Sequence, residues 1–196
     1  SSSLVQNDAG VGYGINRIED NIRSTGRQPV SVWHIIATHC HIDHIGGLHL
    51  WRDKYGSKII AHELDRAGIE GKNNELTAAS MYGVDYRPVM LDTILSGEHN
   101  QIRLGEMEFK VLHTPGHTPG SISVYIDTPE GRVLFGQDIH GPFSPSWGSD
   151  MVEWRRSMRK LLDLEADFLC EGHAGIYRGE EIREYIEGYL RRYSSS

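Results

Sequence analysis

The chain is poor in cysteine, with only Cys40 and Cys170 among its 196 residues. Two cysteines cannot supply the several disulfides on which small secreted domains depend, and unpaired thiols are typical of a reducing compartment. We interpret them as two small hydrophobic residues and expect a cytoplasmic protein without a disulfide framework.

Long apolar runs and basic clusters are also missing. No apolar stretch approaches the roughly 20 residues that cross a bilayer, and no signal segment opens the chain. The net charge is −7, and the longest basic runs are the pairs Arg155-Arg156 and Arg191-Arg192. Neither pair provides the positive surface that a phosphate backbone requires. We therefore expect a small-molecule substrate, and neither a membrane nor a nucleic acid as partner.

The chain of 196 residues, 38% of them hydrophobic, is long enough for one well-buried domain. It is too short for two domains of ordinary size. We predict a single domain over residues 1–196. The serine triplets at 1–3 and 194–196 are expected to be tails outside the fold.

The spacing of apolar residues predicts helices that alternate with strands. Ile15, Ile18 and Ile22 form the stripe of an amphipathic helix over 15–24. On a later helix, Val152 and Trp154 are available to face inward. Further helices are predicted at 48–55, 151–162 and 180–193, and strands at 30–37, 58–62, 101–104, 107–113, 121–127, 132–135 and 168–170. Segment 63–81 is mostly polar, and its composition is compatible with a helix. Strands with helices on both sides indicate an α/β sandwich, and the block 101–135 reads as an antiparallel meander.

The most informative motif is the hexapeptide His39-Cys40-His41-Ile42-Asp43-His44, which follows the apolar run 30–37. Imidazoles and carboxylates are the ligands that Zn²⁺, Fe²⁺ and Mn²⁺ accept, and crowding them without a cation costs desolvation and repulsion. Further candidates are His117, Asp138 and His173, each at a loop after a strand-like run. A four-coordinate catalytic metal needs only three protein ligands, so seven candidates suffice for two metal ions. Cys40 is not counted, because in an extended segment it points away from the neighbouring histidines.

The order of these motifs resembles the metallo-β-lactamase superfamily over roughly residues 4–180. The resemblance implies an αββα sandwich, two sheets back to back with the metal site at one edge. Residues 4–10 resemble a family strand ending in Asp-x-Gly that usually follows one or two earlier strands. We therefore expect the amino end to be trimmed and those strands to be missing. The sheet edge at 4–8 is then exposed or covered by another chain, which allows a homo-oligomer.

The resemblance also implies a ligand set and two divalent cofactor ions, most simply Zn²⁺, with Fe²⁺ or Mn²⁺ as alternatives. One ion is held by His39, His41 and His117, the other by Asp43, His44 and His173, and Asp138 bridges them. Asp8 resembles the family aspartate that accepts a hydrogen bond from a ligand histidine or its loop.

Two cations about 3.5–4 Å apart lower the pKa of a shared water toward ~7, so a metal-bridging hydroxide is the expected nucleophile. Asp43 can orient that water or protonate the leaving group. With Asp43 and Asp138, His140 is a catalytic candidate, as a substrate contact or acid, because it lies two residues past Asp138. His113 lies four residues before His117 and could support a ligand by a hydrogen bond. A side chain with no part in the site is an equally good interpretation. His62, like the other remaining histidines His49 and His99, is expected to be exposed.

Asp138 stands where true β-lactamases carry cysteine, which resembles the glyoxalase II and lactonase branches. The leading prediction is therefore a dinuclear metal-dependent hydrolase of a small thioester, ester or lactone. Two departures limit it. Glyoxalase II proteins append a helical domain where about 23 residues follow His173, and acyl-homoserine lactonases place a tyrosine where this chain has Gly141.

Other functions stay open. Persulfide dioxygenases share an opening that resembles 38–44 but use one Fe²⁺, which His39, His117 and Asp138 would hold. A flavodiiron-type oxidase fits less well, since that group has Glu at the position of His41. A non-catalytic metal-binding protein is the third alternative. The aromatic residues Tyr82, Tyr86, Phe143 and Trp147 are candidate pocket walls, although ordinary core packing explains each equally well.

Overall fold

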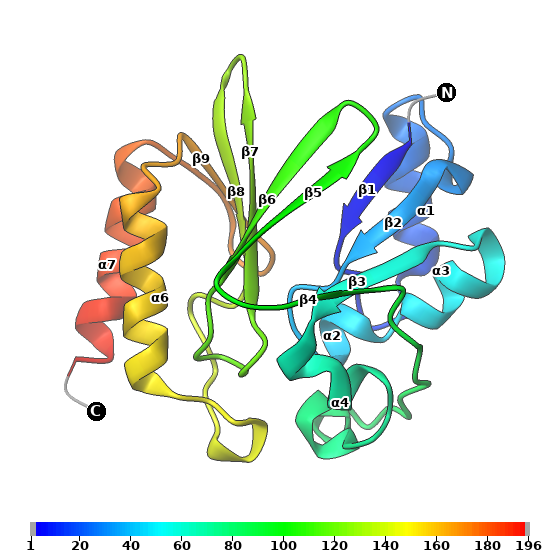
Figure 1. Cartoon of the computed structure of the whole chain (residues 1–196), viewed down its shortest axis with the longest axis horizontal. Helices are drawn as coiled ribbons and strands as arrows, with labels where there is room; N and C mark the ends of the chain where they lie inside the picture. The colour runs from blue at the N-terminus through cyan, green and yellow to red at the C-terminus, as the bar shows by residue number, and fades with distance from the viewer. Residues whose placement is uncertain (1–2, 195–196) are drawn as a thin grey trace. The chain divides into compact units, whose positions relative to one another are not determined.

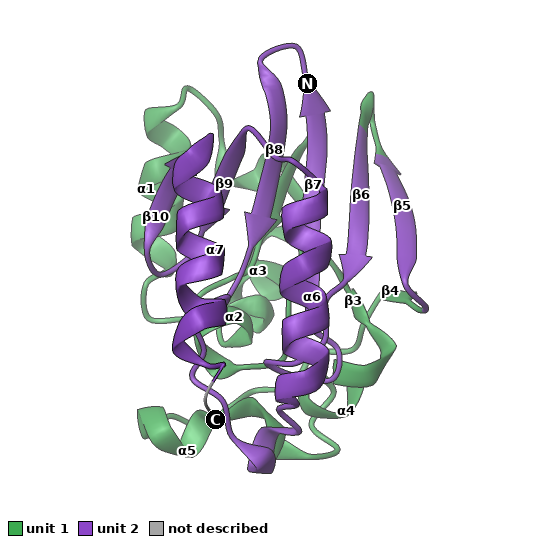
Figure 2. Cartoon of the chain, turned by 90° about the vertical axis from the view of Figure 1, so that its left-hand side faces the viewer, with its two compact units in different colours: residues 1–96, 104–107 green, residues 97–103, 108–196 purple. Residues whose placement is uncertain are grey.

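The computed structural model describes residues 3–194, which divide into two compact units (Figure 2). Among the described residues, unit 1 comprises 3–96 and 104–107, and unit 2 comprises 97–103 and 108–194. The single domain stays a prediction. Apart from Ser3 and Ser194, the predicted serine tails lie outside the described residues. Within residues 3–194, no helix combines the length and the apolar composition needed to cross a bilayer.

Unit 1 contains a four-stranded sheet in the order β1-β2-β3-β4, and all three neighbouring pairs are parallel (Figure 1). The strands are β1 Leu4–Asn7, β2 Val32–Ile36, β3 Lys58–His62 and β4 Thr93–Leu95. The helices are α1 Ile15–Ser24, α2 Ile42–Ile45, α3 Leu48–Tyr55, α4 Arg66–Ile69 and α5 Ala79–Tyr82. In a parallel sheet the carboxyl ends of all strands meet at one edge. The loops after β1, β2 and β3 therefore share that edge.

The core of unit 1 packs α1 and α3 against this sheet. Trp51 and Leu48 of α3 are fully buried with Ile35 of β2, and Ile18 of α1 packs against them. The predicted helix 15–24 is confirmed, and so is the predicted helix 48–55, which Gly56 ends at φ 71°.

Two predicted elements of unit 1 differ in the structure. The strand expected at 30–37 begins only at Val32, because Pro29–Ser31 form a 3₁₀ turn that leaves Val30 exposed. Segment 63–81 is broken into short helical turns, including 3₁₀ turns at Glu63–Asp65 and Asn74–Thr77. Strand β4 was not predicted, since three residues with two exposed side chains carry little pattern.

Unit 2 contains a six-stranded sheet in the order β10-β9-β8-β7-β6-β5. The strands are β5 His99–Leu104, β6 Met107–His113, β7 Ile122–Thr128, β8 Gly131–Gly136, β9 Phe168–Glu171 and β10 Gly175–Arg178. Strands β6, β7 and β8 pair antiparallel, as the predicted meander requires, whereas β8 and β9 pair parallel. Helices α6 Met151–Asp163 and α7 Glu180–Arg192 lie side by side over one face of this sheet (Figure 2).

The core of unit 2 lies between these helices and the sheet. Trp154 and Met158 of α6 are buried with Ile186 of α7 and Leu169 of β9. Val152, which was expected to face inward, is 66% exposed. The prediction was wrong because two residues of helix rotate a side chain by about 200°, away from the face that Trp154 buries.

Candidate metal centre

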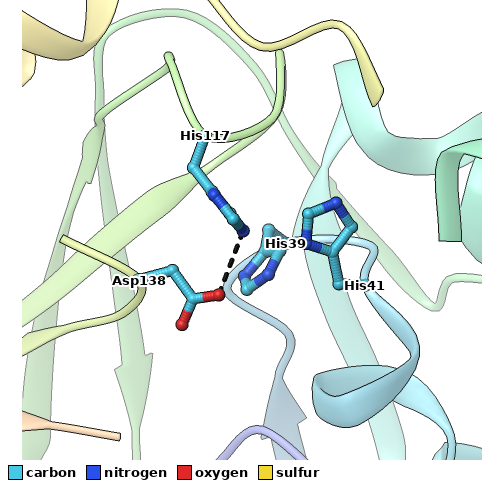
Figure 3. A group of neighbouring side chains, drawn as sticks. All are labelled: His39, His41, His117 and Asp138. Atoms are coloured by element: carbon cyan, nitrogen blue, oxygen red, sulfur yellow. Dashed lines mark ion pairs between the residues drawn. The ribbon is translucent and has the colours of Figure 1, made fainter. Parts of the chain in front are cut away.

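The hexapeptide 39–44 lies at the carboxyl end of β2 and runs into α2, which begins at Ile42. His39, His41 and His44 are buried. The ring centroid of His39 is 4.7 Å from that of His41 (Figure 3) and 4.1 Å from that of His44. The three rings therefore lie close together at the end of β2. Three buried imidazoles at this spacing form the nitrogen-rich donor set that borderline divalent metals accept.

Asp8 holds the hexapeptide from the end of the neighbouring strand β1. Its Oδ1 accepts the main-chain N–H of Thr38 at 2.8 Å, and its Oδ2 accepts the Thr38 hydroxyl, also at 2.8 Å. Nδ1 of His44 donates to the same Oδ2 at 2.8 Å. The predicted role of Asp8 is confirmed. Because Nδ1 is engaged, Nε2 of His44 is the nitrogen that can bind a metal.

A second carboxylate, Asp65, holds the main chain between His39 and His41. Its Oδ2 accepts the N–H of Cys40 at 2.8 Å, and Asp65 is buried. The Cys40 thiol is fully buried and donates to the carbonyl of Leu76 at 3.3 Å, so it points away from the histidines as expected. Burial raises the pKa of this thiol, and the charge of Asp65 adds to the effect. Sequence reasoning missed Asp65, although its place just after β3 at the carboxyl edge of the sheet was a usable signal.

Asp43 contacts a tyrosine from a distant part of unit 1. The Tyr82 hydroxyl donates to Oδ2 of Asp43 at 2.9 Å, and this oxygen lies 3.7 Å from Nε2 of His44. Tyr82, one of the candidate pocket walls, therefore touches a candidate ligand. Tyr86 donates instead to the carbonyl of Ile69 and packs against the core of unit 1.

In unit 2, the Asp138 carboxylate lies between two histidines. Its Oδ2 is 3.0 Å from Nε2 of His117, an ion pair marked by the dashed line in Figure 3, and its Oδ1 is 3.1 Å from Nε2 of His173. His117 and Asp138 are buried, whereas the His173 side chain is 41% exposed. Asp138 has a φ of 51°, an unfavourable left-handed conformation for a residue with a side chain. One carboxylate with an oxygen toward each of two imidazoles has the geometry of a bridging ligand.

The loop that carries His117 is held against α6. The carbonyl of His117 accepts the Ser149 hydroxyl at 2.7 Å, and the carbonyl of Pro115 accepts the Ser157 hydroxyl at 2.7 Å. Gly116 has a φ of 135°, and a Cβ there would lie 2.3 Å from Cα of Trp154. His113 donates from Nε2 to the carbonyl of Pro119 at 2.8 Å, so it supports the loop of His117 rather than its ring.

His140 and Glu171 form a pair next to His173. Nδ1 of His140 donates to Oε1 of the buried Glu171 at 2.9 Å, and the rings of His140 and His173 are 5.4 Å apart. Burial raises the pKa of Glu171, but hydrogen bonds from His140 and from the N–H groups of His173 and Ala174 outweigh it, so the pKa lies below its ordinary value. Asp138, His140 and Glu171 are close enough to share an ion. We do not count them as a metal site, because three N–H donors already occupy Glu171. Sequence reasoning missed Glu171.

The other residues singled out in the sequence have varied surroundings. Phe143 packs on the His117 ring, with centroids 6.0 Å apart, and on Trp154. Trp147 is buried. His62 was expected to be exposed but is 2% exposed, because it ends a core strand and its Nδ1 accepts the N–H of Leu64. His99 is exposed as expected, and His49 is half-buried.

The candidate ligands thus divide between the units. Unit 1 supplies His39, His41, Asp43 and His44, and unit 2 supplies His117, Asp138 and His173. All donor atoms are imidazole nitrogens or carboxylate oxygens, which suits Zn²⁺, Fe²⁺ or Mn²⁺. The donor set therefore fits the implied metal ions.

Comparisons with known proteins agree with this chemistry. The sequence model of the family described as "Metallo-beta-lactamase superfamily" matches residues 8–173. The "Probable metallo-hydrolase YqgX" of Bacillus subtilis is 29% identical over 176 residues, covering 87% of this chain and 79% of that protein. An uncharacterised protein of Aquifex aeolicus is 34% identical over 140 residues, covering 69% of this chain and 64% of that protein. The "Hydroxyacylglutathione hydrolase" of Brucella ovis is 32% identical over 104 residues, which is 53% of this chain but only 32% of the relative.

Solved structures support the fold. The subclass B3 metallo-beta-lactamase BJP-1 of Bradyrhizobium japonicum has a TM-score of 0.82 and 21% identity, covering 100% of this chain and 83% of that one. A metallo-beta-lactamase of Cronobacter sakazakii also has a TM-score of 0.82, at 18% identity, and covers 99% of this chain and 78% of that one. At such identities the likeness concerns the fold alone. The predicted fold class, the metallo-β-lactamase fold with two sheets, is confirmed.

Proposed function

Because the chain belongs to the metallo-beta-lactamase superfamily, we propose that it is a dinuclear metal-dependent hydrolase of a small thioester, ester or lactone. One observation carries the proposal: Asp138 directs Oδ2 toward Nε2 of His117 at 3.0 Å and Oδ1 toward Nε2 of His173 at 3.1 Å. A carboxylate shared in this way by two ligand imidazoles favours two ions over one.

In the proposed centre, His39, His41 and His117 would hold one ion, Asp43, His44 and His173 would hold the other, and Asp138 would be shared by both. We propose Zn²⁺ as the native metal, with Fe²⁺ or Mn²⁺ as alternatives, since imidazole and carboxylate donors suit all three. The contact of Nδ1 of His44 with Asp8 supports this assignment, because it leaves Nε2 as the ligand atom.

When bound, two such ions supply a water with a pKa near ~7 and polarise the carbonyl oxygen under attack. The chain's own residues manage the protons and the orientation. Asp43, held at Oδ2 by the Tyr82 hydroxyl, is placed to hold a proton of the attacking water or pass it to the leaving group. His140, whose Nδ1 donates to Glu171, offers Nε2 to the substrate as a contact, and as a proton donor when the ring is doubly protonated.

The proposed bridging position supports this substrate class. Asp138 in place of cysteine resembles the glyoxalase II and lactonase branches, and the Brucella relatives are named hydroxyacylglutathione hydrolases. A thioester is therefore our first choice, and an ester or a lactone would meet the same carbonyl chemistry.

One observation favours a second candidate, a mononuclear Fe²⁺ persulfide dioxygenase. His39, His117 and Asp138 are buried, whereas His173, a ligand only in the dinuclear centre, is 41% exposed at its side chain. The buried three would suffice for a two-histidine, one-carboxylate iron site.

Two assays separate these functions. Protein purified without added metal is first analysed for metal identity and stoichiometry. Zinc- or manganese-loaded protein is then assayed with acyl thioesters, esters and lactones, and iron-loaded protein is placed in an oxygen electrode with glutathione persulfide. We expect two metal ions per chain, hydrolysis, and no oxygen uptake.

The variant His44→Ala sharpens the test. His44 belongs only to the dinuclear set, so hydrolysis should collapse by orders of magnitude, while an iron dioxygenase should lose little. His99→Ala, at an exposed histidine of β5, is the matched control and should behave like the parent. Persulfide-dependent oxygen uptake that survives His44→Ala, without hydrolysis under any metal, would refute the proposed function.

A further inference from the structure

Glu171 is the last residue of β9, and its side chain has 0% exposure. Three N–H groups from unit 2 converge on its carboxylate. Oε1 accepts Nδ1 of His140 at 2.9 Å, and Oε2 accepts the main-chain N–H groups of His173 at 2.9 Å and Ala174 at 2.8 Å. A single buried side chain thus closes the turn between β9 and β10 and also holds an imidazole.

This arrangement matters because of where His173 lies. Its side chain is 41% exposed, and its Nε2 lies 3.1 Å from Oδ1 of Asp138. Because the ring extends from this turn, the main chain of the turn contributes to the position of Nε2. The same carboxylate sets the His140 ring, whose centroid lies 5.4 Å from that of His173. The two rings are anchored to one group.

We infer that Glu171 is a positioning residue of the proposed metal centre, which fixes the turn that carries His173 and the orientation of His140 at the same time. The inference rests on the proposed function in so far as His173 binds a metal. Glu171 lies outside the ligand motifs. We expect it to contribute measurably to the affinity for the ion that His173 would hold. Partners that orient ligand histidines are typically worth about 10- to 100-fold in metal affinity.

Two substitutions separate the effects of the carboxylate. Glu171→Ala removes every contact. In Glu171→Gln, the amide oxygen can still accept the two main-chain N–H groups, while the amide NH₂ faces Nδ1 of His140 and requires that nitrogen to accept. His140 must then carry its proton on Nε2. The glutamine variant thus keeps the turn and reverses the tautomer of the ring.

The experiment measures affinity for Zn²⁺ by competition with a coloured chelator. We expect Glu171→Ala to weaken the more loosely bound ion by about 10- to 100-fold and Glu171→Gln to restore it to within about threefold of the parent. In the metal-free protein, the amides of His173 and Ala174 should be protected from exchange in the parent and in Glu171→Gln but not in Glu171→Ala. Long-range ¹H–¹⁵N spectra should show the proton of His140 on Nδ1 in the parent and on Nε2 in Glu171→Gln.

Glu19 provides the matched control, as a buried glutamate of unit 1 that also accepts three hydrogen bonds. Glu19→Ala should lower the melting temperature without changing Zn²⁺ affinity. If Glu171→Ala does not fold, Glu171→Asp replaces it, since a side chain one methylene shorter cannot reach both the turn and His140, and its affinity should fall between those of alanine and glutamine.

The outcomes separate this inference from the proposed function. Parental affinity in folded Glu171→Ala, or an equal loss in Glu171→Gln with the amides still protected, would overturn the positioning role alone. A parent that binds two ions but hydrolyses nothing would overturn the hydrolase proposal and leave the effect of Glu171 standing. A parent that binds no metal would overturn both.

Discussion

The two units supply candidate ligands in opposite ways. Unit 1 concentrates them in residues 39–44, after one strand of a parallel sheet. Unit 2 takes His117, Asp138 and His173 from three separate turns of a largely antiparallel sheet. Ligands that are close in sequence are positioned by the conformation of one loop. Ligands that are far apart in sequence are positioned by the register of several strands and by the packing beneath their loops.

The groups that hold the ligand loops also differ between the two units. In unit 1, Asp8 and Asp65 hold the ligand loop by accepting main-chain N–H groups. In unit 2, the loop of His117 is held by hydroxyl groups of α6 and its approach and by close packing at Gly116, and only the turn of His173 is held by a carboxylate. The positions of the candidate ligands in unit 2 should therefore be more sensitive to changes in packing than those in unit 1.

Removing the shared carboxylate should have the largest effect. Asp138→Ala takes away a carboxylate that contacts both His117 and His173, so at least one metal ion should be lost. Hydrolysis should fall by more than the roughly 10- to 100-fold expected for loss of an orienting partner. Elemental analysis and a thioester assay check this. Asp127→Ala, at a half-exposed aspartate of β7, is the control, and one tightly held ion in both parent and Asp138→Ala would contradict a dinuclear centre.

Removing Asp8, which supports the ligand loop of unit 1, should weaken metal binding less than removing a ligand. Asp8→Ala leaves the Thr38 N–H, the Thr38 hydroxyl and Nδ1 of His44 without their acceptor, so metal affinity should fall by about 10- to 100-fold. Chelator competition measures the change, with Asp20→Ala at an exposed aspartate of α1 as control. Equal affinity in both variants would show that the hexapeptide holds its shape without Asp8.

Packing under the loop of His117 gives the next test. Gly116→Ala places a Cβ 2.3 Å from Cα of Trp154, so the loop or α6 must shift, at a cost of about 1–3 kcal/mol in unfolding free energy. The displaced His117 should also bind metal more weakly. Gly188→Ala is the control: no atom lies within 4 Å of the added methyl group, and stability should rise by about 0.5–1 kcal/mol. Denaturant titration and chelator competition measure both, and unchanged values for Gly116→Ala would contradict the rigid loop.

The smallest effect concerns a buried carboxylate of unit 1 outside the ligand loop. Burial raises the pKa of Glu19, but hydrogen bonds from Lys54, Tyr55 and Arg23 outweigh it and hold the pKa below its ordinary value of 4.5. A lowered pKa in the folded state stabilises the protein above the unfolded pKa, and this contribution is lost as the pH falls through the folded value.

Glu19→Gln should therefore lower the unfolding free energy by about 1 kcal/mol at neutral pH, with a difference that shrinks below about pH 4.5. Urea titrations from pH 3 to 7 test the sign, with Glu184→Gln at an exposed glutamate of α7 as control. A difference that grows toward acid pH would show that the partners do not stabilise the ionised form.

Local sequence determined much of the molecule. The isoleucine stripe of 15–24, the meander from β6 to β8 and the density of residues 39–44 are short-range patterns, and each appears in the structure as expected. Such patterns can be read because the side chains involved are neighbours along one strand or on one helix face.

Only the tertiary structure decided which distant groups support the ligands. Asp65 binds the N–H of Cys40 across 25 positions, Tyr82 reaches Asp43 across 39, and Glu171 reaches His140 across 31. Each is a common polar residue with no motif of its own, so nothing in its neighbourhood along the chain marks the distant group that it contacts. Its partner is chosen by strand order and loop packing, which bring buried carboxylates to N–H groups because an unpaired charge in the interior is too costly to keep.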